Sequence, residues 1–375
     1  MHSKIDDTIY IKLPEGYQTQ GKIGKLNKAI YGLKKAPRYW YDNFDRAVIK
    51  MGFKRSLSDM CLYIKVCDEY RIYLVVFVDD ILIFSSDEDQ VTDVKNKLAE
   101  NFKTKDLGLA SYYLGMSITQ TANGIYLDQS TYLKKVLNLY NMSECKEINL
   151  PLEANFECKM LYRDKSESLE LENTCRRIIG SLMYAMVGTR PDLSIYLNIL
   201  SRYQSCASED LLRYLKRLLR YVKGMDADWG GDPETRKSTS GYCLKVFNSL
   251  VQWTSKKQTC VSLSSTESEY VALSQCVSEA CWLRNLFVEL NLLPNEMLKF
   301  VVYEDNQSAI SAANRCGQPR RLKHIDLRYQ FVQQAIKDYA IVLKYIGTNE
   351  QIADMLTKPL SFVKFKLFRE LLGMV

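Results

Sequence analysis

Histidine is almost missing from this sequence. His2 and His324 are the only two among 375 residues, which leaves little room for histidine-based metal centres or Ser-His-Asp triads. The sequence also lacks a P-loop and an internal repeat, which argues against P-loop nucleotide hydrolases and repeat architectures. No apolar run is long enough to span a membrane, so we expect no membrane partner.

The cysteines do not form a disulfide framework. Their number, 11, is odd, they are scattered, and no apolar signal segment opens the sequence, so we expect a reducing compartment rather than secretion. No pair has zinc-finger spacing, and Cys276 and Cys281 lie in an apolar helical pattern typical of buried thiols. The net charge of +7 permits a polyanionic partner without requiring one.

Two adjacent carboxylates interrupt an otherwise apolar stretch, YLVVFVDDILIF, at residues 73–84. Its Val, Ile, Phe and Tyr content predicts a strand or hairpin, but burying Asp79 and Asp80 without partners would be costly. Three solutions remain open at this point. The pair lies in a tight turn facing water, each acid meets an Arg or Lys, or both face a divalent cation.

Two segments combine basic residues with apolar or aromatic ones. In KIGKLNKAIYGLKKAPRYWYDNF, Lys34, Lys35 and Arg38 stand among aromatic rings, which suits phosphate contacts with base stacking or an amphipathic helix with a solvated basic face. The second segment, LLRYLKRLLRYVK, predicts a helix whose basic face is either phosphate-binding or simply solvated. Its basic residues are Arg213, Lys216, Arg217, Arg220 and Lys223.

Further elements follow from periodicity and turn residues. They are a helix over 88–102, a hairpin over 112–129 with an Asn123-Gly124 turn, a helix capped by Ser130 or Thr131, an irregular linker over 144–172, and an all-helical stretch over 174–224. From Asp226 onward, strands come first and then alternate with helices. That order predicts a mixed sheet with helices packed on it.

Four acids in this C-terminal part stand at unusual places. Asp226 lies on a predicted strand, Glu269 on the apolar stripe of a predicted helix, Asp305 at a strand end and Asp354 on the last predicted helix. Taken singly, a helix cap or a solvated acid explains them. Together they would converge at one sheet edge as a two-metal phosphodiesterase site, because Mg²⁺ takes oxygen ligands and needs no histidine.

Nine sequence blocks occur in order along nearly the whole chain. These blocks are KLNKAIYGLKKAPRYWYD, YLVVFVDDILIFSSD, KDLGLASYYLGMSI, RIIGSLMYAMVGTRPDLS, RKSTSGY, SSTESEYVAL, YEDNQSAI, KHIDLRY and ADMLTKPL. FVDDIL, within the second block, is similar to the metal-binding signature of reverse transcriptases. In these blocks and in their order, the chain resembles the Pol polyproteins of copia-type (Pseudoviridae-like) LTR retrotransposons. The resemblance implies a polymerase palm and thumb followed by a ribonuclease H domain, acting on primer–template nucleic acid or an RNA–DNA hybrid.

The resemblance also implies residue roles. Asp79 and Asp80 match the polymerase metal-binding pair, and Tyr112, Tyr113 and Gly115 lie in a segment similar to the primer-gripping hairpin. The implied ribonuclease H ligands are Asp226, Glu269, Asp305 and Asp354. The implied cofactor is Mg²⁺, two ions per active site, with Mn²⁺ as a substitute.

Two departures from the family pattern shape the expectation. The third polymerase Asp, found in a block like DVKTAFL, and the fingers region do not occur in this sequence, so we expect an N-terminally truncated reverse transcriptase without polymerase activity. Only Met225 stands between Gly224 and Asp226, where the family has a few tens of residues, so the first ribonuclease H strand is expected to be shortened. Hybrid cleavage stays compatible with the four acids; the alternative is a non-catalytic nucleic-acid-binding relic or a domesticated transposon protein.

The predicted architecture is a multidomain α+β or α/β chain. It places a partial reverse transcriptase palm at 1–155, a helical thumb or connection segment at 156–224 and a ribonuclease H-like mixed sheet with flanking helices at 225–375. We expect a cytoplasmic location, in a virus-like particle as in the family, or a nuclear one. Association with an intact retrotransposon polyprotein is a further expected interaction.

Overall fold

The computed structural model forms two compact units, each described by itself. The first unit is Met1–Ala110 with Leu286–Leu292, and the second is Ser111–Asn285 with Leu293–Val375. The structure describes residues 5, 7–17, 21–30, 32–67, 69–154, 156, 161–162, 164–224, 238–258, 264–292, 299–314, 326–338 and 341–374. The predicted domain limits stay predictions.

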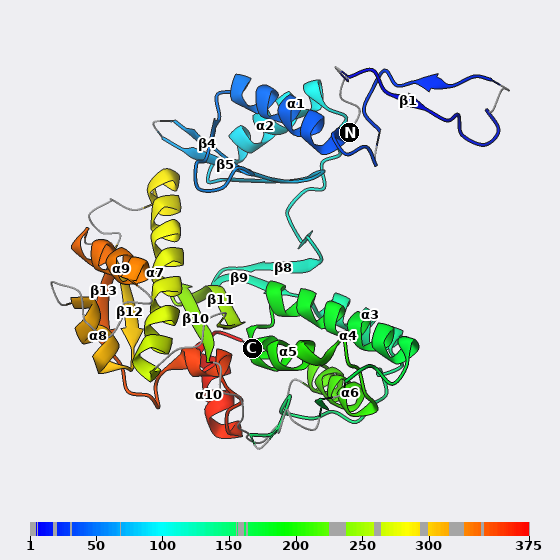
Figure 1. The fold of residues 1–375 in the computed structure, drawn as a ribbon. Coiled ribbons are helices and arrows are strands. Elements are labelled where there is room, and N and C mark those ends of the chain that lie inside the picture. Colours follow the sequence, from blue (N-terminus) through cyan, green and yellow to red (C-terminus); the bar gives the residue numbers. More distant parts are fainter. Residues whose placement is uncertain are drawn as a thin grey trace. The chain divides into compact units, whose positions relative to one another are not determined.

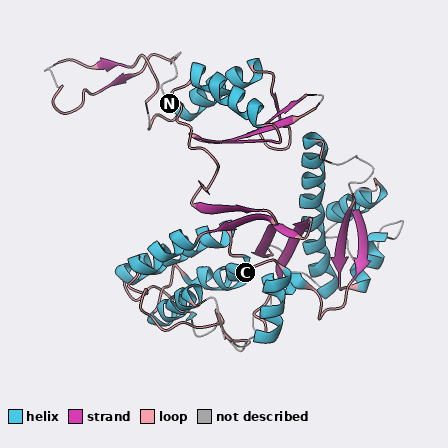
Figure 2. Ribbon diagram, turned by 180° about the vertical axis from the view of Figure 1, so that it is seen from behind, coloured by secondary structure: helices cyan, strands magenta, loops and turns pink. Residues whose placement is uncertain are grey.

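The first unit is a four-stranded sheet with two helices on one face (Figures 1 and 2). Its antiparallel strand order is β3-β4-β5-β6, and β1 pairs with β2 as a separate hairpin. The bounds are β1 Tyr10–Ile11, β2 Gly24–Lys25, α1 Ala36–Lys50, β3 Lys54–Arg55, β4 Leu62–Val66, β5 Arg71–Phe77, β6 Asp80–Ser85 and α2 Glu88–Asn101.

Alternation along β5 explains how this sheet packs. Ile72, Leu74 and Val76 point to one face and are buried, as expected for a strand with one covered face. The helices bring Phe44, Val48, Val94 and Leu98 to the same core. The predicted helix over 88–102 is confirmed as α2, whose N-cap Asp87 accepts a hydrogen bond from the Gln90 N–H at 3.1 Å.

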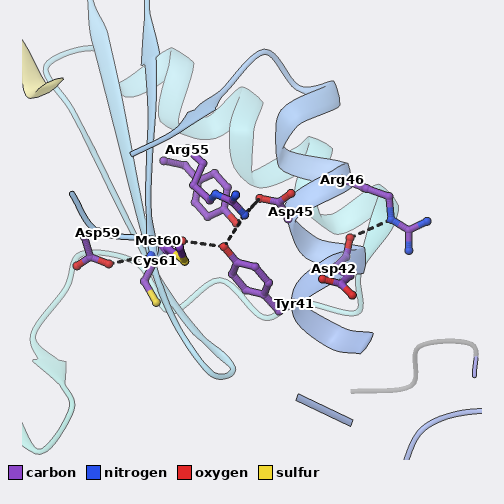
Figure 3. A network of polar contacts seen from close by, with 9 residues as sticks. Tyr41, Asp42, Asp45, Arg46, Arg55, Asp59, Met60 and Cys61 are labelled. Carbon is purple, nitrogen blue, oxygen red and sulfur yellow. Dashed lines mark hydrogen bonds and ion pairs between the residues drawn. The ribbon is translucent and has the colours of Figure 1, made fainter. Parts of the chain in front are cut away.

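The aromatic residues of the predicted basic–aromatic segment hold α1 against the sheet. The Tyr41 hydroxyl donates to the Met60 carbonyl at 3.0 Å and accepts from Arg55 at 3.0 Å, and Arg55 also pairs with Asp45 at 3.3 Å (Figure 3). Trp40 packs edge-on against Phe102, with ring centroids 5.2 Å apart. These rings pack within the first unit, so the amphipathic-helix interpretation of the segment describes them better than base stacking.

The second unit contains three small sheets and a group of helices. Its bounds before α7 are β7 Tyr112–Tyr113, β8 Met116–Thr121, β9 Gly124–Asp128, α3 Ser130–Leu139, α4 Leu169–Gly188, η2 Pro191–Leu193, α5 Ser194–Leu200, η3 Ser201–Tyr203, α6 Glu209–Lys223, β10 Thr239–Val246 and β11 Ser249–Lys257. Then follow α7 Ser265–Leu290, β12 Phe300–Glu304, α8 Gln307–Asn314, α9 Asp326–Lys337, β13 Ile341–Tyr345, η6 Ile352–Leu356 and α10 Phe362–Leu371.

One hydrophobic core joins distant parts of this unit. Helices α3 to α6 share it with Phe365 and Phe368 of α10, and Phe365 lies with its ring centroid 6.0 Å from that of Tyr221 on α6. The predicted linker over 144–172 also enters this core, since Leu150 and Leu152 are fully buried. The interpretation of this segment as a linker is therefore wrong. Its apolar residues follow neither a helical nor a strand period, so the sequence pattern did not indicate that they are buried.

Two local predictions shift by a residue or two. Thr121 pairs with Gly124 in the β8–β9 hairpin, so the turn is Ala122-Asn123 rather than Asn123-Gly124. The N-cap of α3 is Gln129 and makes no side-chain capping bond. Ser130 is the first helical residue and donates its N–H to the Asp128 carboxylate at 2.9 Å, so Asp128 satisfies one of the free N–H groups of the first turn.

Strands of the C-terminal part form antiparallel and parallel pairs. β10 pairs antiparallel with β11, and β12 pairs parallel with β13, so the mixed α/β class is confirmed. Within the described residues these are two separate sheets rather than the single mixed sheet expected. The expected shortened first strand and Asp226 lie outside the described residues. The expected helix around Asp354 is the short 3-10 helix η6.

Two predictions made from the composition can be compared with the structure. No helix that the structure describes is both long and apolar enough to cross a membrane. The eight cysteines among the described residues are free thiols. Cys276 is buried as predicted, and Cys281 is half-buried.

Candidate functional site

The two adjacent acids of YLVVFVDDILIF lie at a hairpin turn. Phe77 pairs with Asp80, so Val78 and Asp79 form the turn between β5 and β6, and both carboxylates are exposed. The turn prediction is therefore confirmed. Neither acid forms an ion pair with any Lys or Arg that the structure describes. Metal binding by this pair stays a prediction.

Val78 adopts a left-handed backbone conformation in this turn, with φ of 55°. A β-branched residue is strained there, at a cost of about 1–3 kcal/mol. The Trp40 indole N–H donates to the Val78 carbonyl at 2.8 Å. This bond from α1 helps to hold the strained turn and so fixes how the Asp79 and Asp80 carboxylates project.

Three of the four predicted ribonuclease H acids line one cavity of about 820 Å³. Glu269 comes from the first turns of α7, Asp305 follows the end of β12, and Asp354 lies in η6. The structure thus brings together residues that are 85 positions apart at most, from three different elements. We call this cavity the carboxylate cavity.

Burial and mutual repulsion dominate the electrostatics of the carboxylate cavity. Burial raises the pKa of Glu269, and the charges of Asp305 and Asp354 raise it further. Glu304, the last residue of β12, also lines the cavity. Burial raises the pKa of Glu304 to about 8, although its carboxylate accepts the Asn306 N–H at 3.0 Å. Such crowded carboxylates are stabilised by a cation.

Two lysines pair with Asp354 in the carboxylate cavity. Lys358 Nζ lies 2.8 Å from Asp354 Oδ1, and Lys364 Nζ lies 3.0 Å from Oδ2. Lys364 also donates to the Thr348 carbonyl at 2.9 Å. Asp354 is buried, and a buried carboxylate requires such partners.

The donor atoms of the cavity are of the type that magnesium prefers. They are carboxylate oxygens from Glu269, Asp305 and Asp354, and Mg²⁺ uses one or two carboxylates with several waters. In the part of the chain that the structure describes, no three acidic, Cys or His side chains lie close enough to hold one ion together. Asp226, the fourth predicted ligand, lies outside these described residues, and water or substrate oxygens would complete the coordination of a magnesium ion.

Three residues of the cavity region were not predicted from the sequence: Glu304, Lys358 and Lys364. The sequence could have indicated Glu304, because period-two alternation along β12 places it on the same buried face as Val302. The sequence indicates Lys358 more weakly, through its position four residues after Asp354. Lys364 comes from α10, and only the tertiary fold brings it to Asp354.

The predicted basic residues of α1 lie at its exposed N-terminal end. Lys34, Lys35 and Arg38 are exposed. Lys35 pairs with Asp7 at 2.6 Å, and Arg38 approaches Asp42 at 3.8 Å. Exposed pairs of this kind are weak, so the three cations stay able to contact phosphate.

The basic face of α6 has partners in its own unit. Arg217 Nε donates to the Pro151 carbonyl at 3.1 Å, Arg220 Nε to the Lys146 carbonyl at 2.7 Å, and Lys223 Nζ to the Cys145 carbonyl at 2.9 Å. Arg213, nearer the start of the helix, pairs with Asp210 at 2.9 Å. These bonds fasten the irregular segment at 145–151 to α6, a role that was not predicted from the sequence. Phosphate binding by this face of α6 stays a prediction.

The YYLGM segment forms the tight turn between β7 and β8. Tyr113 pairs with Met116, and Leu114 and Gly115 both have positive φ, 47° and 77°, as in a type I′ turn. The Tyr184 hydroxyl of α4 donates to the Leu114 carbonyl. A Cβ atom at Gly115 would overlap that hydroxyl. Tyr112 is exposed, so its ring is available to a ligand.

Comparison with known proteins assigns the family. Residues 1–154 match the family model described as reverse transcriptase (RNA-dependent DNA polymerase). The whole chain aligns with the retrovirus-related Pol polyprotein from transposon TNT 1-94 of Nicotiana tabacum at 36% identity and with that from transposon RE1 of Arabidopsis thaliana at 32%. The chain belongs to the copia-type retrotransposon Pol polyproteins.

This Pol polyprotein chain spans less than a third of those relatives, 30% of the Nicotiana protein and 26% of the Arabidopsis one. It also covers 94% of an uncharacterised mitochondrial protein of Arabidopsis thaliana at 34% identity, using 56% of its own length. A solved foamy viral protease-reverse transcriptase in complex with RNA/DNA hybrid shows a weaker likeness. Its TM-score is 0.46 at 15% identity, over 88% of this chain and 40% of that one.

Proposed function

We propose that the second unit hydrolyses RNA in RNA–DNA hybrids as a ribonuclease H. The observation that supports this most is the convergence of Glu269, Asp305 and Asp354 on the carboxylate cavity from three separate elements. Asp226 is proposed as the fourth ligand from its sequence match alone. In this proposal the ribonuclease H-like domain is 225–375, the helical connection is 156–224 and the palm is 1–155.

The chemistry requires carboxylates around divalent cations. Bound Mg²⁺, two ions in the full site, would activate the attacking water and stabilise the leaving oxygen of the phosphodiester. Glu269 and Asp305 would supply oxygen ligands. Lys364 would keep the Asp354 carboxylate in a fixed orientation, since it binds both Asp354 and the Thr348 carbonyl.

We also propose a role for the first unit in holding nucleic acid. Asp79 and Asp80, exposed at the hairpin turn, would face a metal ion, while Lys34, Lys35 and Arg38 would contact backbone phosphates. In the second unit, Tyr112 of the β7–β8 hairpin would separately offer a stacking surface. The proposed substrate is an RNA–DNA hybrid or a primer–template duplex.

The test is cleavage of a labelled RNA–DNA hybrid by the purified 375-residue chain with MgCl₂. We expect cleavage that is lost in Asp305→Asn and kept in Asp338→Asn, a matched acid exposed at the end of α9. Absence of cleavage by a folded chain that binds the hybrid would refute the hydrolase proposal.

A primer–template in the same assay tests the palm. We expect no primer extension by the 375-residue chain alone, because two-metal phosphoryl transfer needs several carboxylates and the hairpin turn supplies Asp79 and Asp80. Extension that Asp80→Asn abolishes would contradict this expectation.

A second candidate function is nucleic-acid binding without catalysis. The observation that favours it is the double pairing of Asp354 with Lys358 and Lys364, which opposes metal ligation by that residue. Hybrid binding that weakens with salt, without cleavage in either MgCl₂ or MnCl₂, is the result expected from this alternative.

A further inference from the structure

Both oxygens of the Asp354 carboxylate are engaged by lysines. Lys358 holds Oδ1 at 2.8 Å and Lys364 holds Oδ2 at 3.0 Å. Each carboxylate oxygen has two lone pairs, so a lysine partner does not by itself block a cation. An ammonium group beside that oxygen repels the cation, however, so ligation by Asp354 is weakened unless the lysine moves away.

The two lysines are not equally able to move. Lys364 lies on α10, its side chain is 22% exposed, and its ammonium group also donates to the Thr348 carbonyl and lies 5.1 Å from the Phe368 ring centroid. These contacts anchor Lys364 in place. The Lys358 side chain, just after η6, is 52% exposed, so it can turn into solvent at a small cost.

The charge of Lys358 also acts on Glu269, a second acid of the carboxylate cavity. It lines that cavity together with Glu269 and Asp305. Its positive charge opposes the rise in the pKa of Glu269 that burial, Asp305 and Asp354 cause. The ammonium group of Lys358 thus compensates more than one carboxylate, as a bound cation would.

We propose that Lys358 is a built-in counter-ion of the carboxylate cavity and competes with divalent cations for Asp354 Oδ1. Lys364 has a different role, that of a positioning residue that keeps Oδ2 oriented. The inference rests on the proposed function, because it takes the cavity to be the metal site. It concerns how strongly this chain binds metal, so it can be tested without measuring cleavage.

The experiment is titration of the 375-residue chain with MnCl₂, with free Mn²⁺ followed by electron paramagnetic resonance. The binding component lost in Asp305→Asn belongs to the carboxylate cavity. For that component we expect Lys358→Gln to bind Mn²⁺ about three- to tenfold more tightly, the size expected from removing one partly exposed competing charge. Lys358→Arg retains the charge and should stay close to the parent chain.

Three further variants separate this role from a general change in charge. Lys366→Gln removes a cation from an exposed position on α10 and should leave the affinity unchanged. Lys364→Gln should weaken binding, because Asp354 loses its orienting partner. Lys358→Met, which keeps the aliphatic length without the charge, should reproduce the effect of Lys358→Gln; thermal melts confirm that each variant is folded.

The outcomes distinguish the inference from the proposed function. Binding that depends on Asp305 but is equally strong in the parent chain, Lys358→Gln and Lys358→Met would overturn the competition alone. No Asp305-dependent binding in any variant would overturn both the metal site and the competition. Binding that becomes measurable only when Lys358 is replaced would support both.

Discussion

At the scale of single residues, Val78 carries strain next to the two exposed acids. Its φ of 55° suits glycine better than a β-branched residue. Because Val78 is 53% exposed, replacing it loses little buried area. We expect Val78→Gly to raise the free energy of unfolding of the first unit by about 0.5–1 kcal/mol, the strain relieved minus the entropy that glycine adds to the unfolded chain.

The measurement is urea denaturation, with Val66→Gly as the matched control. Val66 is 57% exposed and ends β4, where glycine should lower the unfolding free energy by about 1 kcal/mol. If both variants were destabilised alike, the conformation of Val78 would not be a source of strain.

Asp192 is a second residue whose environment gives a sharp expectation. Burial opposes its ionisation, but bonds from Arg190 at 2.7 and 2.9 Å and the nearby charge of Arg369 hold the pKa of Asp192 below its ordinary value of 3.8. Tyr221 also donates a hydrogen bond to this carboxylate. Asp192→Asn should lower the unfolding free energy by about 3–5 kcal/mol, because it leaves the buried Arg190 without a counter-ion.

The stabilisation that the Asp192–Arg190 pair provides should depend on pH. A depressed folded-state pKa means that the stabilisation is fully present above 3.8 and is lost as the pH falls below that value toward the folded pKa. Urea melts from pH 7 to pH 3 should therefore show that the difference in unfolding free energy between the parent chain and Asp192→Asn becomes smaller only below about pH 4. Asp210→Asn, at a surface pair with Arg213, should cost less than about 1 kcal/mol at any pH. If the difference in unfolding free energy caused by Asp192→Asn stayed constant down to pH 3, the lowered pKa of Asp192 would be contradicted.

At the scale of elements, the β7–β8 hairpin depends on a glycine for two separate reasons. Gly115 and Gly108 have nearly the same φ, 77° and 75°, but a Cβ atom at Gly108 would meet open space while one at Gly115 would overlap Tyr184. Gly108→Ala should cost about 1 kcal/mol from backbone strain alone. Gly115→Ala should cost about 1–3 kcal/mol more, because Tyr184 must move.

Hydrogen exchange over residues 111–128 measures the consequence for the hairpin. Tyr184→Phe removes the bond to the Leu114 carbonyl without adding a Cβ atom at Gly115, so it should speed exchange in this peptide and leave exchange in α6 unchanged. Equal exchange in Tyr184→Phe and the parent chain would mean that Tyr184 does not hold the hairpin.

The basic elements α1 and α6 should respond differently to loss of charge. Arg220→Gln removes a bond to the Lys146 carbonyl, so we expect it to lower the unfolding free energy by about 1–2 kcal/mol with little effect on hybrid affinity. Lys34→Gln should leave stability unchanged, weaken hybrid binding and reduce the salt dependence of the binding constant by about one unit of slope. Fluorescence anisotropy at several salt concentrations, beside urea melts, checks both. A common effect of the two changes on hybrid affinity would restore α6 as a nucleic-acid surface.

The elements also show what sequence patterns reveal. The α2 helix and the Asp79–Asp80 hairpin were predictable, because helical caps and apolar runs act within a few residues. The partners of Arg217 and Arg220 were not, because they are backbone carbonyls of an irregular segment without periodicity. Glu269, Asp305 and Asp354 line one cavity, and their role as metal ligands stays a prediction. The lysines at Asp354 depend on tertiary contacts. Pattern reasoning finds the unusual acids and misses what compensates their charge.

At the scale of the whole molecule, the second unit should behave as one cooperative body. The α10 helix follows the carboxylate cavity in sequence but packs in the core of α3 to α6, where Phe365 is fully buried between Tyr196 and Tyr221. A cavity created at Phe365 should therefore weaken elements on both sides of the proposed domain limit at 224. We expect Phe365→Ala to lower the unfolding free energy of this unit by about 3–5 kcal/mol.

Hydrogen exchange decides whether that loss is shared. In Phe365→Ala, amides of α6 and of β13 should lose protection together, whereas Val363→Ala, at a position 66% exposed on the same helix, should change neither. Loss of protection confined to residues 341–374 would mean that the helical segment folds independently of the ribonuclease H-like part. Shared loss would mean that the proposed connection and the proposed catalytic domain are one folding unit, so the carboxylate cavity could not be retained after removal of the helices.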